Sequence, residues 1–344
     1  MEHILDLGFD SLEKRVLSFD EPEYRAKQIW EGLYKHFYKD WHEFTNLPNS
    51  LITTLSDHFD ILPIQLINEE ITADGNTIKT LFQLNDGLYI ESVHLVNRNR
   101  NTICISTQVG CPVGCLFCAT GRMGFFRNLF PSEIIGQILF FSNRFKKLDQ
   151  KIQNIVLMGM GEPFLNFDAT LQAMILLNDP TGFDIGARRI TISTIGIVEK
   201  IIEIADENRQ FNLAISLHAP NDGIRQKLIP IAKKYPIKNI LTAADYYILK
   251  TNRRITYEYV LIDKINSTTE HALEFANLIK HQNCHVNLIA LNPNSHFDGD
   301  SPSFDSITKF SKILLNNGIP TTIRNSQGSN IKAGCGQLAG TQSS

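Results

Sequence analysis

The sequence predicts an α/β fold in which a parallel sheet curls into an open, partial barrel of about six βα units. Beyond residue 100, segments of strand length that are almost continuously apolar alternate with segments of helix length. Strands that are apolar on both faces are typical of a parallel sheet covered by helices. Because a closed barrel of this type needs eight units, the sheet is expected to stay open.

The predicted barrel spans residues 101–325, and its elements are runs of apolar residues between polar or glycine-rich turns. Strands are expected at 102–107, 153–160, 189–194, 211–217, 254–262, 285–291 and 319–324. Helices are expected between them at 131–145, 167–178, 197–207, 237–250, 268–281 and 302–317. Since parallel strands end at one edge of a sheet, the loops that follow them are expected to share one face.

Two smaller units are predicted before the barrel, and a tail after it. Residues 1–62 are expected to form a small helical accessory domain, with a short helix at 49–59. Its main helix begins at Glu21-Pro22-Glu23, and its apolar residues recur at helical spacing: Ile29, Leu33 and Phe37. Residues 63–100 are expected to be a β-rich extension with a hairpin of 77–84 and 88–96 around Asn85-Asp86-Gly87. Residues 326–344 form the tail.

Composition excludes several classes of protein. The chain has 344 residues, 43% of them hydrophobic, and a net charge of −3. It has no apolar run of membrane-spanning length and no signal pattern, so we expect a cytoplasmic protein without membrane contact. Thiols stay reduced there, and clustered cysteines then indicate metal rather than structural disulfides. Residues 92–132 and 306–344 contain no acidic residue, which is compatible with a polyanion held over a site.

Three cysteines lie within eight residues, at Cys111, Cys115 and Cys118, on the loop after the first barrel strand. Interleaved glycines, at Gly110, Gly114 and Gly121, let the backbone turn three sulfurs toward one point. A structural zinc ion would need a fourth ligand, for which there are three candidates: His94, Cys104 and Cys335. A cubane iron–sulfur cluster on three thiolates would leave one iron open to a ligand. The spacing favours the cluster and leaves zinc open.

Short polar motifs end several of the predicted strands on the edge that carries the cysteine loop. Their residues are Gly161 and Glu162 in Met158–Pro163, Ser193, the run Ser216-Leu217-His218, and Asn292. Each motif alone is weak, because glycine-rich turns and single histidines are common in structural roles. Their convergence on one face predicts a ligand pocket in which Glu162 faces a cationic group.

Two further thiols, Cys104 and Cys335, could be either structural or functional. Cys104 lies in the first barrel strand, and Cys335 lies in the tail between Gly334 and Gly336. A buried Cys104 and a stray terminal Cys335 are the plain interpretations. The flanking glycines instead indicate a thiol that can approach a substrate closely. Cys284 is expected in the core.

These residues carry a specific resemblance. The Cys-x3-Cys-x2-Cys loop followed by Gly124-Phe125-Phe126 resembles the radical S-adenosylmethionine (radical SAM) superfamily. The run from Cys104 to Cys111, the Gly159–Pro163 turn and Cys335-Gly336-Gln337-Leu338 resemble its RlmN/Cfr family of RNA adenine methyltransferases. The likeness extends over essentially the whole chain, including Pro22–Gln28. It implies a partial radical SAM barrel and an RNA-binding role for residues 1–62.

The resemblance also implies the site. One [4Fe–4S] cluster per chain would be held by Cys111, Cys115 and Cys118, and two SAM molecules would be used per turnover. SAM would be bound by the strand-end residues: Gly161, Glu162, Ser193, Ser216, Leu217, His218 and Asn292. Cys335 would carry the methyl group as S-methylcysteine, Glu91 would accept the ring proton, and Cys104 would release the product through a transient disulfide with Cys335.

The implied substrates are an adenosine of the peptidyl-transferase centre in 23S rRNA and the adenosine next to the tRNA anticodon. Val109 and Pro163 favour the branch that methylates C2 of adenine, whereas Ser193–Ile197 resembles the branch that methylates C8 and confers antibiotic resistance. Two tail residues depart from the family pattern: Asn330 stands for Asp, and Gly334 for Ala. The implied partners are 23S rRNA, tRNA and an electron donor such as flavodoxin or ferredoxin, with the enzyme a monomer.

Two alternatives stay open from the sequence. The first is a zinc-stabilised RNA-binding protein without catalysis. The second is a radical SAM enzyme that acts on a protein or a small molecule.

Overall fold

The computed structural model describes residues 2–98, 100–294, 296–324 and 326–340. The last four residues of the predicted tail, 341–344, lie outside this range. Ten strands form one sheet in the order β14-β13-β12-β11-β10-β9-β6-β5-β4-β3. The sheet is parallel from β6 to β14 and antiparallel from β3 to β6, and it does not close. The prediction of an α/β fold with an open, partial barrel is confirmed.

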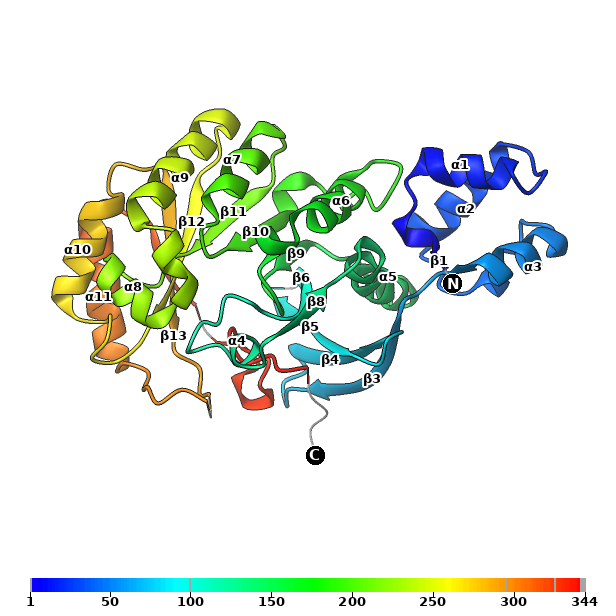
Figure 1. Cartoon of the computed structure of the whole chain (residues 1–344). Coiled ribbons are helices and arrows are strands. Elements are labelled where there is room, and N and C mark those ends of the chain that lie inside the picture. Colours follow the sequence, from blue (N-terminus) through cyan, green and yellow to red (C-terminus); the bar gives the residue numbers. More distant parts are fainter. Residues whose placement is uncertain (1, 99, 295, 325, 341–344) are drawn as a thin grey trace.

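The parallel part contains the predicted alternation of strands and helices, which surround the sheet on its outer side (Figure 1). Its strands are β6 (Arg100–Cys104), β9 (Asn154–Leu157), β10 (Ile190–Thr194), β11 (Asn212–Ser216), β12 (Ile255–Leu261), β13 (Cys284–Ala290) and β14 (Thr321–Arg324). The helices are α5 (Pro131–Lys147), α6 (Phe167–Asn178), α7 (Val198–Asp206), α8 (Asp222–Leu228), α9 (Ile237–Thr251), α10 (Thr269–Ile279) and α11 (Phe304–Asn316). The predicted strands overrun β6 and β9, because the apolar run continues into the buried turns that follow. The sequence did not indicate α8.

Short 3₁₀ turns connect several of these elements: η3 (Pro163–Asn166), η4 (Ala187–Arg189), η5 (Pro230–Lys234) and, in the tail, η6 (Ser329–Ile331). Helix starts follow local chemistry. Pro131 opens α5, and the hydroxyl of Ser303 accepts the Ser306 N–H at 3.2 Å to cap α11.

The β-rich extension continues the barrel sheet. Its strands are β3 (Ile64–Ile71), β4 (Thr77–Leu84) and β5 (Tyr89–Asn97), and β5 pairs with β6. The predicted hairpin of β4 and β5 is present, and Gly87 takes the positive φ of 84° at its turn. A separate two-stranded ribbon consists of β7 (Gln108–Gly110) and β8 (Phe125–Asn128), and the short helix α4 (Ala119–Arg122) precedes β8.

Residues 2–60 form a helical unit at one end of the sheet (Figure 1). It contains β1 (Glu2–His3), η1 (Ile4–Asp6), α1 (Phe9–Leu17), α2 (Tyr24–Tyr34), η2 (Trp41–Glu43), α3 (Asn49–His58) and β2 (Phe59–Asp60). The prediction that Phe37 continues the main helix is wrong: α2 ends at Tyr34, and Phe37 has a φ of 58°. The indole Nε1 of Trp30 donates to the Thr181 carbonyl at 2.8 Å and so ties α2 to the barrel. In the described part of the chain, no helix has the length and hydropathy of a membrane span.

Candidate active site

A cavity of about 910 Å³, part of it open to solvent, lies at the carboxyl ends of the parallel strands. Most of the residues singled out in the sequence line it: Cys111, Cys115, Cys118, Gly161, Glu162, Ser193, Ser216, His218, Asn292 and Cys335. The edge of a parallel sheet thus gathers side chains that are as far apart as residues 111 and 335. Leu217, Glu91 and Cys104 do not line the cavity, and each lies behind or beside it.

The cysteine loop owes its shape to glycines. Gly110 has a φ of 75°, and a Cβ at this position would collide with the Gly124 carbonyl oxygen. A Cβ on Gly121 would lie 2.9 Å from the Cys115 nitrogen. The Cys111 N–H donates to the Gly124 carbonyl at 2.8 Å and joins the loop to β8. The backbone therefore leaves little room for any residue larger than glycine.

Burial governs the protonation of the three thiols. It raises the pKa of Cys111 to about 12 and that of Cys115 well above the ordinary thiol value, and neighbouring thiols add to the effect on Cys115. Burial likewise raises the pKa of Cys118. These groups stay neutral thiols unless a positive charge is placed among them, as metal coordination would do.

The three candidates for a fourth zinc ligand differ in whether they lie near the loop cysteines. His94 is engaged elsewhere: its ring contacts the Asn101 side chain at 3.0 Å and packs on Phe145 with 4.8 Å between centroids. Cys335 lines the cavity with the three loop cysteines, whereas Cys104 lies outside its lining. In the described ranges, no three His, Cys, Asp or Glu side chains are arranged to hold a single metal ion, whereas the thiolates of a cubane cluster each bind a different iron.

Glu162 lines the cavity together with the three loop cysteines. Its Oε1 accepts the Phe164 N–H at 3.0 Å and its Oε2 accepts the Ile195 N–H at 2.8 Å. Burial raises the pKa of Glu162 to about 7, although the two backbone N–H groups oppose the shift. Gly161 lies so close to the Gln108 side chain that a Cβ at position 161 would be 2.6 Å from the Gln108 Cβ. A bound ammonium group would restore the charge of this carboxylate.

Ser193, Ser216 and His218 line the cavity from β10, from β11 and from the turn after β11. The hydroxyls of Ser193 and Ser216 lie 3.4 Å apart at the ends of β10 and β11. His218 Nδ1 accepts the Val260 N–H at 3.1 Å, and burial lowers the pKa of His218 to about 3. His218 is therefore a neutral ring that presents a fixed shape. Leu217 is completely buried, and its carbonyl accepts from the Arg225 Nε at 3.3 Å.

The tail places Cys335 in this cavity through hydrogen bonds to the body. The Gly336 carbonyl accepts the Ala119 N–H at 2.7 Å, and the Leu338 carbonyl accepts the Thr120 hydroxyl at 2.6 Å. The Asn292 side chain donates to the Cys335 carbonyl at 3.0 Å. The strand-end asparagine and α4 thus both grip the segment that carries the thiol.

Sequence reasoning missed a charged pair, Glu258 and Arg324, that lines the cavity. An Arg324 nitrogen lies 3.5 Å from Glu258 Oε2, and Asn287 Nδ2 donates to Glu258 Oε1 at 2.8 Å. Burial raises the pKa of Cys104 to about 12, with a further contribution from Cys335, whereas Arg324 lowers it. The two thiols are therefore within electrostatic reach of each other and of Arg324. An acid inside an otherwise apolar strand is the signal that could have found Glu258.

Glu91 lies on β5, outside the cavity and beneath the tail. Its Oε2 accepts the Ala339 N–H at 2.7 Å and the Gly340 N–H at 3.1 Å. The Lys79 Nζ lies 3.5 Å from its Oε1. The carboxylate is 3% exposed, so the tail covers it while Cys335 lines the cavity.

Comparison with known proteins identifies the class. Residues 105–276 match the model of the radical SAM superfamily. The fold also matches a crystal structure of a radical SAM methyltransferase from Sphaerobacter thermophilus, with a TM-score of 0.97 and 43% identity over 99% of this chain and 100% of that one. An open α/β barrel with three cysteines at its carboxyl edge is the radical SAM architecture.

More specific matches identify the family. Residues 3–61 match the N-terminal domain of ribosomal RNA large-subunit methyltransferases. The "probable dual-specificity RNA methyltransferase RlmN" proteins of Dictyoglomus thermophilum and Clostridium tetani are each 45% identical over 98% of this chain, and over 97% and 96% of their own lengths. The chain belongs to the RlmN family of radical SAM RNA methyltransferases, as the sequence motifs predicted.

Membership implies an iron–sulfur cluster and SAM, and the residues fit both. Three thiols line one cavity on a loop whose turns depend on glycines at Gly110 and Gly121. Glu162 and the strand-end hydroxyls face that cavity and suit an amino acid headgroup and a ribose.

Proposed function

We propose that this enzyme methylates C2 of an adenosine in 23S rRNA and in tRNA, and that Cys335 carries the methyl group. The proposal rests on the position of Cys335. This residue lines the same cavity as the three loop cysteines, and the backbone around it is hydrogen-bonded to Asn292 and α4. A thiol in that position serves methyl transfer directly. A site that only holds a cluster on the three loop thiols does not require a fourth thiol.

In this proposal Cys111, Cys115 and Cys118 hold a [4Fe–4S] cluster. When bound, the cluster supplies the electron that cleaves SAM to a 5′-deoxyadenosyl radical. Glu162 pairs with the SAM amino group. The other strand-end residues bind the rest of the cofactor: Gly161, Ser193, Ser216, Leu217, His218 and Asn292. Since Leu217 is buried behind the wall, it acts through its backbone and by packing.

Cys335 first takes a methyl group from one SAM by displacement, with S-adenosylhomocysteine as leaving group. The methyl group on Cys335 would then lose a hydrogen atom to the 5′-deoxyadenosyl radical from a second SAM, and the resulting carbon radical would bond to C2 of the adenine. This route suits C2 because the carbon is electron-poor and does not attack a sulfonium itself. Two SAM molecules are consumed per product.

Release needs a base and a second thiol. After the carbon radical has bonded to C2, the adduct would return one electron to the redox centre that supplied it, and Glu91 would take the proton from C2. The Cys104 thiolate would then attack the sulfur of Cys335 to form a disulfide, and the released carbon would keep the C–S bonding pair and take a proton to complete the methyl group. The tail bonds to Glu91 must break before RNA reaches the carboxylate. The tail therefore takes two positions in turn, one over the cavity for methyl loading and one that admits the target base.

We infer that the helical unit of residues 1–62 binds RNA, that 63–100 extends the barrel of 101–325, and that 326–344 acts as the catalytic tail. The enzyme works as a cytoplasmic monomer. A low-potential protein such as flavodoxin or ferredoxin supplies electrons and restores the reduced thiols.

Anaerobically reconstituted protein, given SAM, reductant and unmodified 23S rRNA or tRNA, tests this proposal. We expect 2-methyladenosine in the RNA digest by mass spectrometry. Appearance of 8-methyladenosine would move the enzyme to the C8 branch. SAM cleavage without any methyladenosine would indicate a different substrate, and a colourless protein that holds zinc without sulfide would contradict the cluster.

A further inference from the structure

The strand β8 and the turn that leads from it into α5 carry large apolar side chains that face solvent. Phe125, Phe126 and Phe130 are 46%, 58% and 56% exposed, and we call these three residues the aromatic ridge. Exposed phenylalanines add no buried area to the core, and three of them within six residues of the chain indicate an interaction surface. Other exposed apolar residues lie elsewhere, such as Leu249 on α9 at 80% and Ile71 at the end of β3 at 56%.

The aromatic ridge lies beside the mouth of the active site. Phe125 pairs with Gly110 across the ribbon, one residue before the cluster ligand Cys111. The Gly124 carbonyl, directly before Phe125, accepts the Cys111 N–H at 2.8 Å. The ridge therefore adjoins the loop whose cysteines line the cavity.

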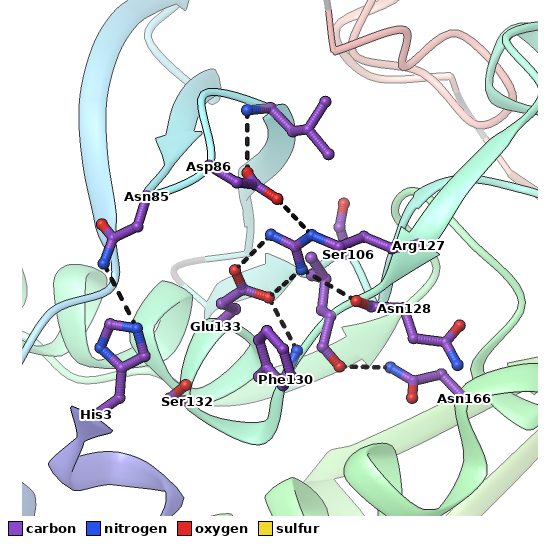
Figure 2. A network of polar contacts seen from close by, with 12 residues as sticks. His3, Asn85, Asp86, Ser106, Arg127, Asn128, Phe130, Ser132, Glu133 and Asn166 are labelled. Carbon is purple, nitrogen blue, oxygen red and sulfur yellow. Dashed lines mark hydrogen bonds and ion pairs between the residues drawn. The ribbon is translucent and has the colours of Figure 1, made fainter. Parts of the chain in front are cut away.

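A network of polar contacts holds Arg127 and Phe130 in place (Figure 2). The Arg127 guanidinium lies between Asp86 at 2.6 Å and Glu133 at 2.7 Å. The same guanidinium stands 5.4 Å above the Phe130 ring, and the Phe130 N–H donates to Glu133 at 2.9 Å. Because both acids neutralise Arg127, its role here is to orient the ribbon rather than to attract an anion.

The charge near the ridge favours an anionic partner, since the two carboxylates there, Asp86 and Glu133, are both paired with Arg127. Residues 92–132 contain no acidic residue. Arg122 is exposed on α4, next to the ridge, and no carboxylate of the described residues pairs with it. Aromatic side chains interleaved with arginines are the pattern of single-stranded nucleic-acid surfaces, where rings stack on bases and cations follow the backbone.

We propose that the aromatic ridge stacks the unpaired nucleobases that flank the target adenosine. The inference rests on the proposed RNA methylation. A base that enters the cavity must leave its own stack, and its neighbours then expose their faces. Phe125 and Phe126 offer them rings at the mouth of the site, with Phe126 the more exposed of the two.

The test measures the affinity of the holoenzyme for an unmodified anticodon stem-loop that carries 2-aminopurine beside the target adenosine. We expect F126A and F126L to weaken binding by about tenfold, since base–aromatic stacking contributes about 1–3 kcal/mol per base, and F126W to bind like the wild type. The fluorescence quench on binding should vanish in F126A and persist in F126W. L249A is the matched control, and unfolding temperature and iron content verify that each variant is intact.

Three outcomes would overturn the inference. The first is unchanged affinity and quench in F126A. The second is full rescue by F126L, which would indicate apolar contact without stacking. The third is unchanged RNA affinity with slower reduction by a protein donor, which would assign the ridge to that donor. Failure of the proposed function is separate, because it would appear as wild-type enzyme that binds the RNA and leaves it unmethylated.

Discussion

Two regions of this molecule present thiols to the same cavity, and they are built in opposite ways. The cysteine loop follows a buried strand, is bonded to β8, and needs glycines at positions where a Cβ would meet backbone. In its described part, the tail has no regular element beyond the turn Ser329–Ile331. Individual hydrogen bonds to α4, Asn292 and Glu91 hold it.

The difference matches the chemistry that each region is proposed to perform. A cluster must be held in one geometry, so its ligands belong on a loop that the barrel fixes. A methyl carrier must meet first SAM and then RNA, so its thiol belongs on a segment whose bonds can be exchanged for others. Folding stability and catalytic movement are thereby separated within one cavity.

The largest effect should come from removing one thiol of each kind. C118A should lose iron and all SAM cleavage, because its cluster lacks a ligand. C335A should keep both, and RNA methylation should fall to background. Iron content, 5′-deoxyadenosine and methyladenosine, measured on the same preparations, check this pair. Loss of SAM cleavage in C335A would mean that the tail thiol also supports the cluster.

Next in size is the effect of Glu91. E91Q keeps an oxygen that can accept the Ala339 and Gly340 N–H groups but cannot take a proton. We expect RNA methylation to slow by about 10²–10⁴-fold, as for loss of a general base, while methylation of Cys335 proceeds normally. Mass spectrometry of the Cys335 peptide and of the RNA separates the two steps. An equal slowing of both steps would assign Glu91 to anchoring the tail.

Backbone strain distinguishes the loop from the rest of the molecule. G110A puts a Cβ at a positive φ against the Gly124 carbonyl, and a strained residue costs on the order of 1–3 kcal/mol. We expect lower iron content and a lower unfolding temperature. G186A is the control, since Gly186 has a φ of −52° and no atom within 4 Å of the added Cβ. Equal iron content in the two variants would contradict a glycine-shaped loop.

A milder change tests the tail. In G334A, the added Cβ would lie 2.7 Å from Asn292 Nδ2, which donates to the Cys335 carbonyl. Losing one such bond costs about 0.5–1.5 kcal/mol, so Cys335 methylation should slow a few-fold with iron content unchanged. A single-turnover methylation assay measures this. Unaltered kinetics would mean that Asn292 is not needed to seat the tail.

The smallest effect is a pH dependence outside both regions. Burial lowers the pKa of His94 below its usual 6.5. In the unfolded chain, the His94 imidazole then binds a proton at a higher pH than it does in the folded protein. The free energy of unfolding should therefore fall as the pH drops below about 6.5. Urea unfolding of wild type and H94Q at pH 5.5 and 7.5 measures it. The loss at low pH should be smaller in H94Q, and an equal loss would assign it to other groups.

The sequence predicted the barrel well, because strands buried on both faces and glycine-rich turns leave a strong pattern. It also placed Glu162, Ser193 and Asn292 on one edge, since parallel strands end together. It missed α1 and α8, which are short. It missed Glu258 and Arg324 because a charged residue within a strand has no motif, and only the packed sheet shows which cavity it faces.

Sequence also could not show where the tail lies. Residues 91 and 339 are far apart in the chain, and no periodicity links them, yet their hydrogen bond covers the candidate base. Contacts of this kind depend on the whole fold rather than on local pattern.

Isotope retention tests the central claim, that Cys335 carries the methyl group, most directly. The enzyme would be incubated with SAM bearing a trideuterated methyl group, first without and then with unmodified RNA. We expect a trideuterated methyl group on the Cys335 peptide, and RNA methyladenosine that retains two deuterium atoms, because one is removed before the carbon bonds to the base. Three deuterium atoms in the RNA product, or an unlabelled Cys335, would contradict transfer through this thiol.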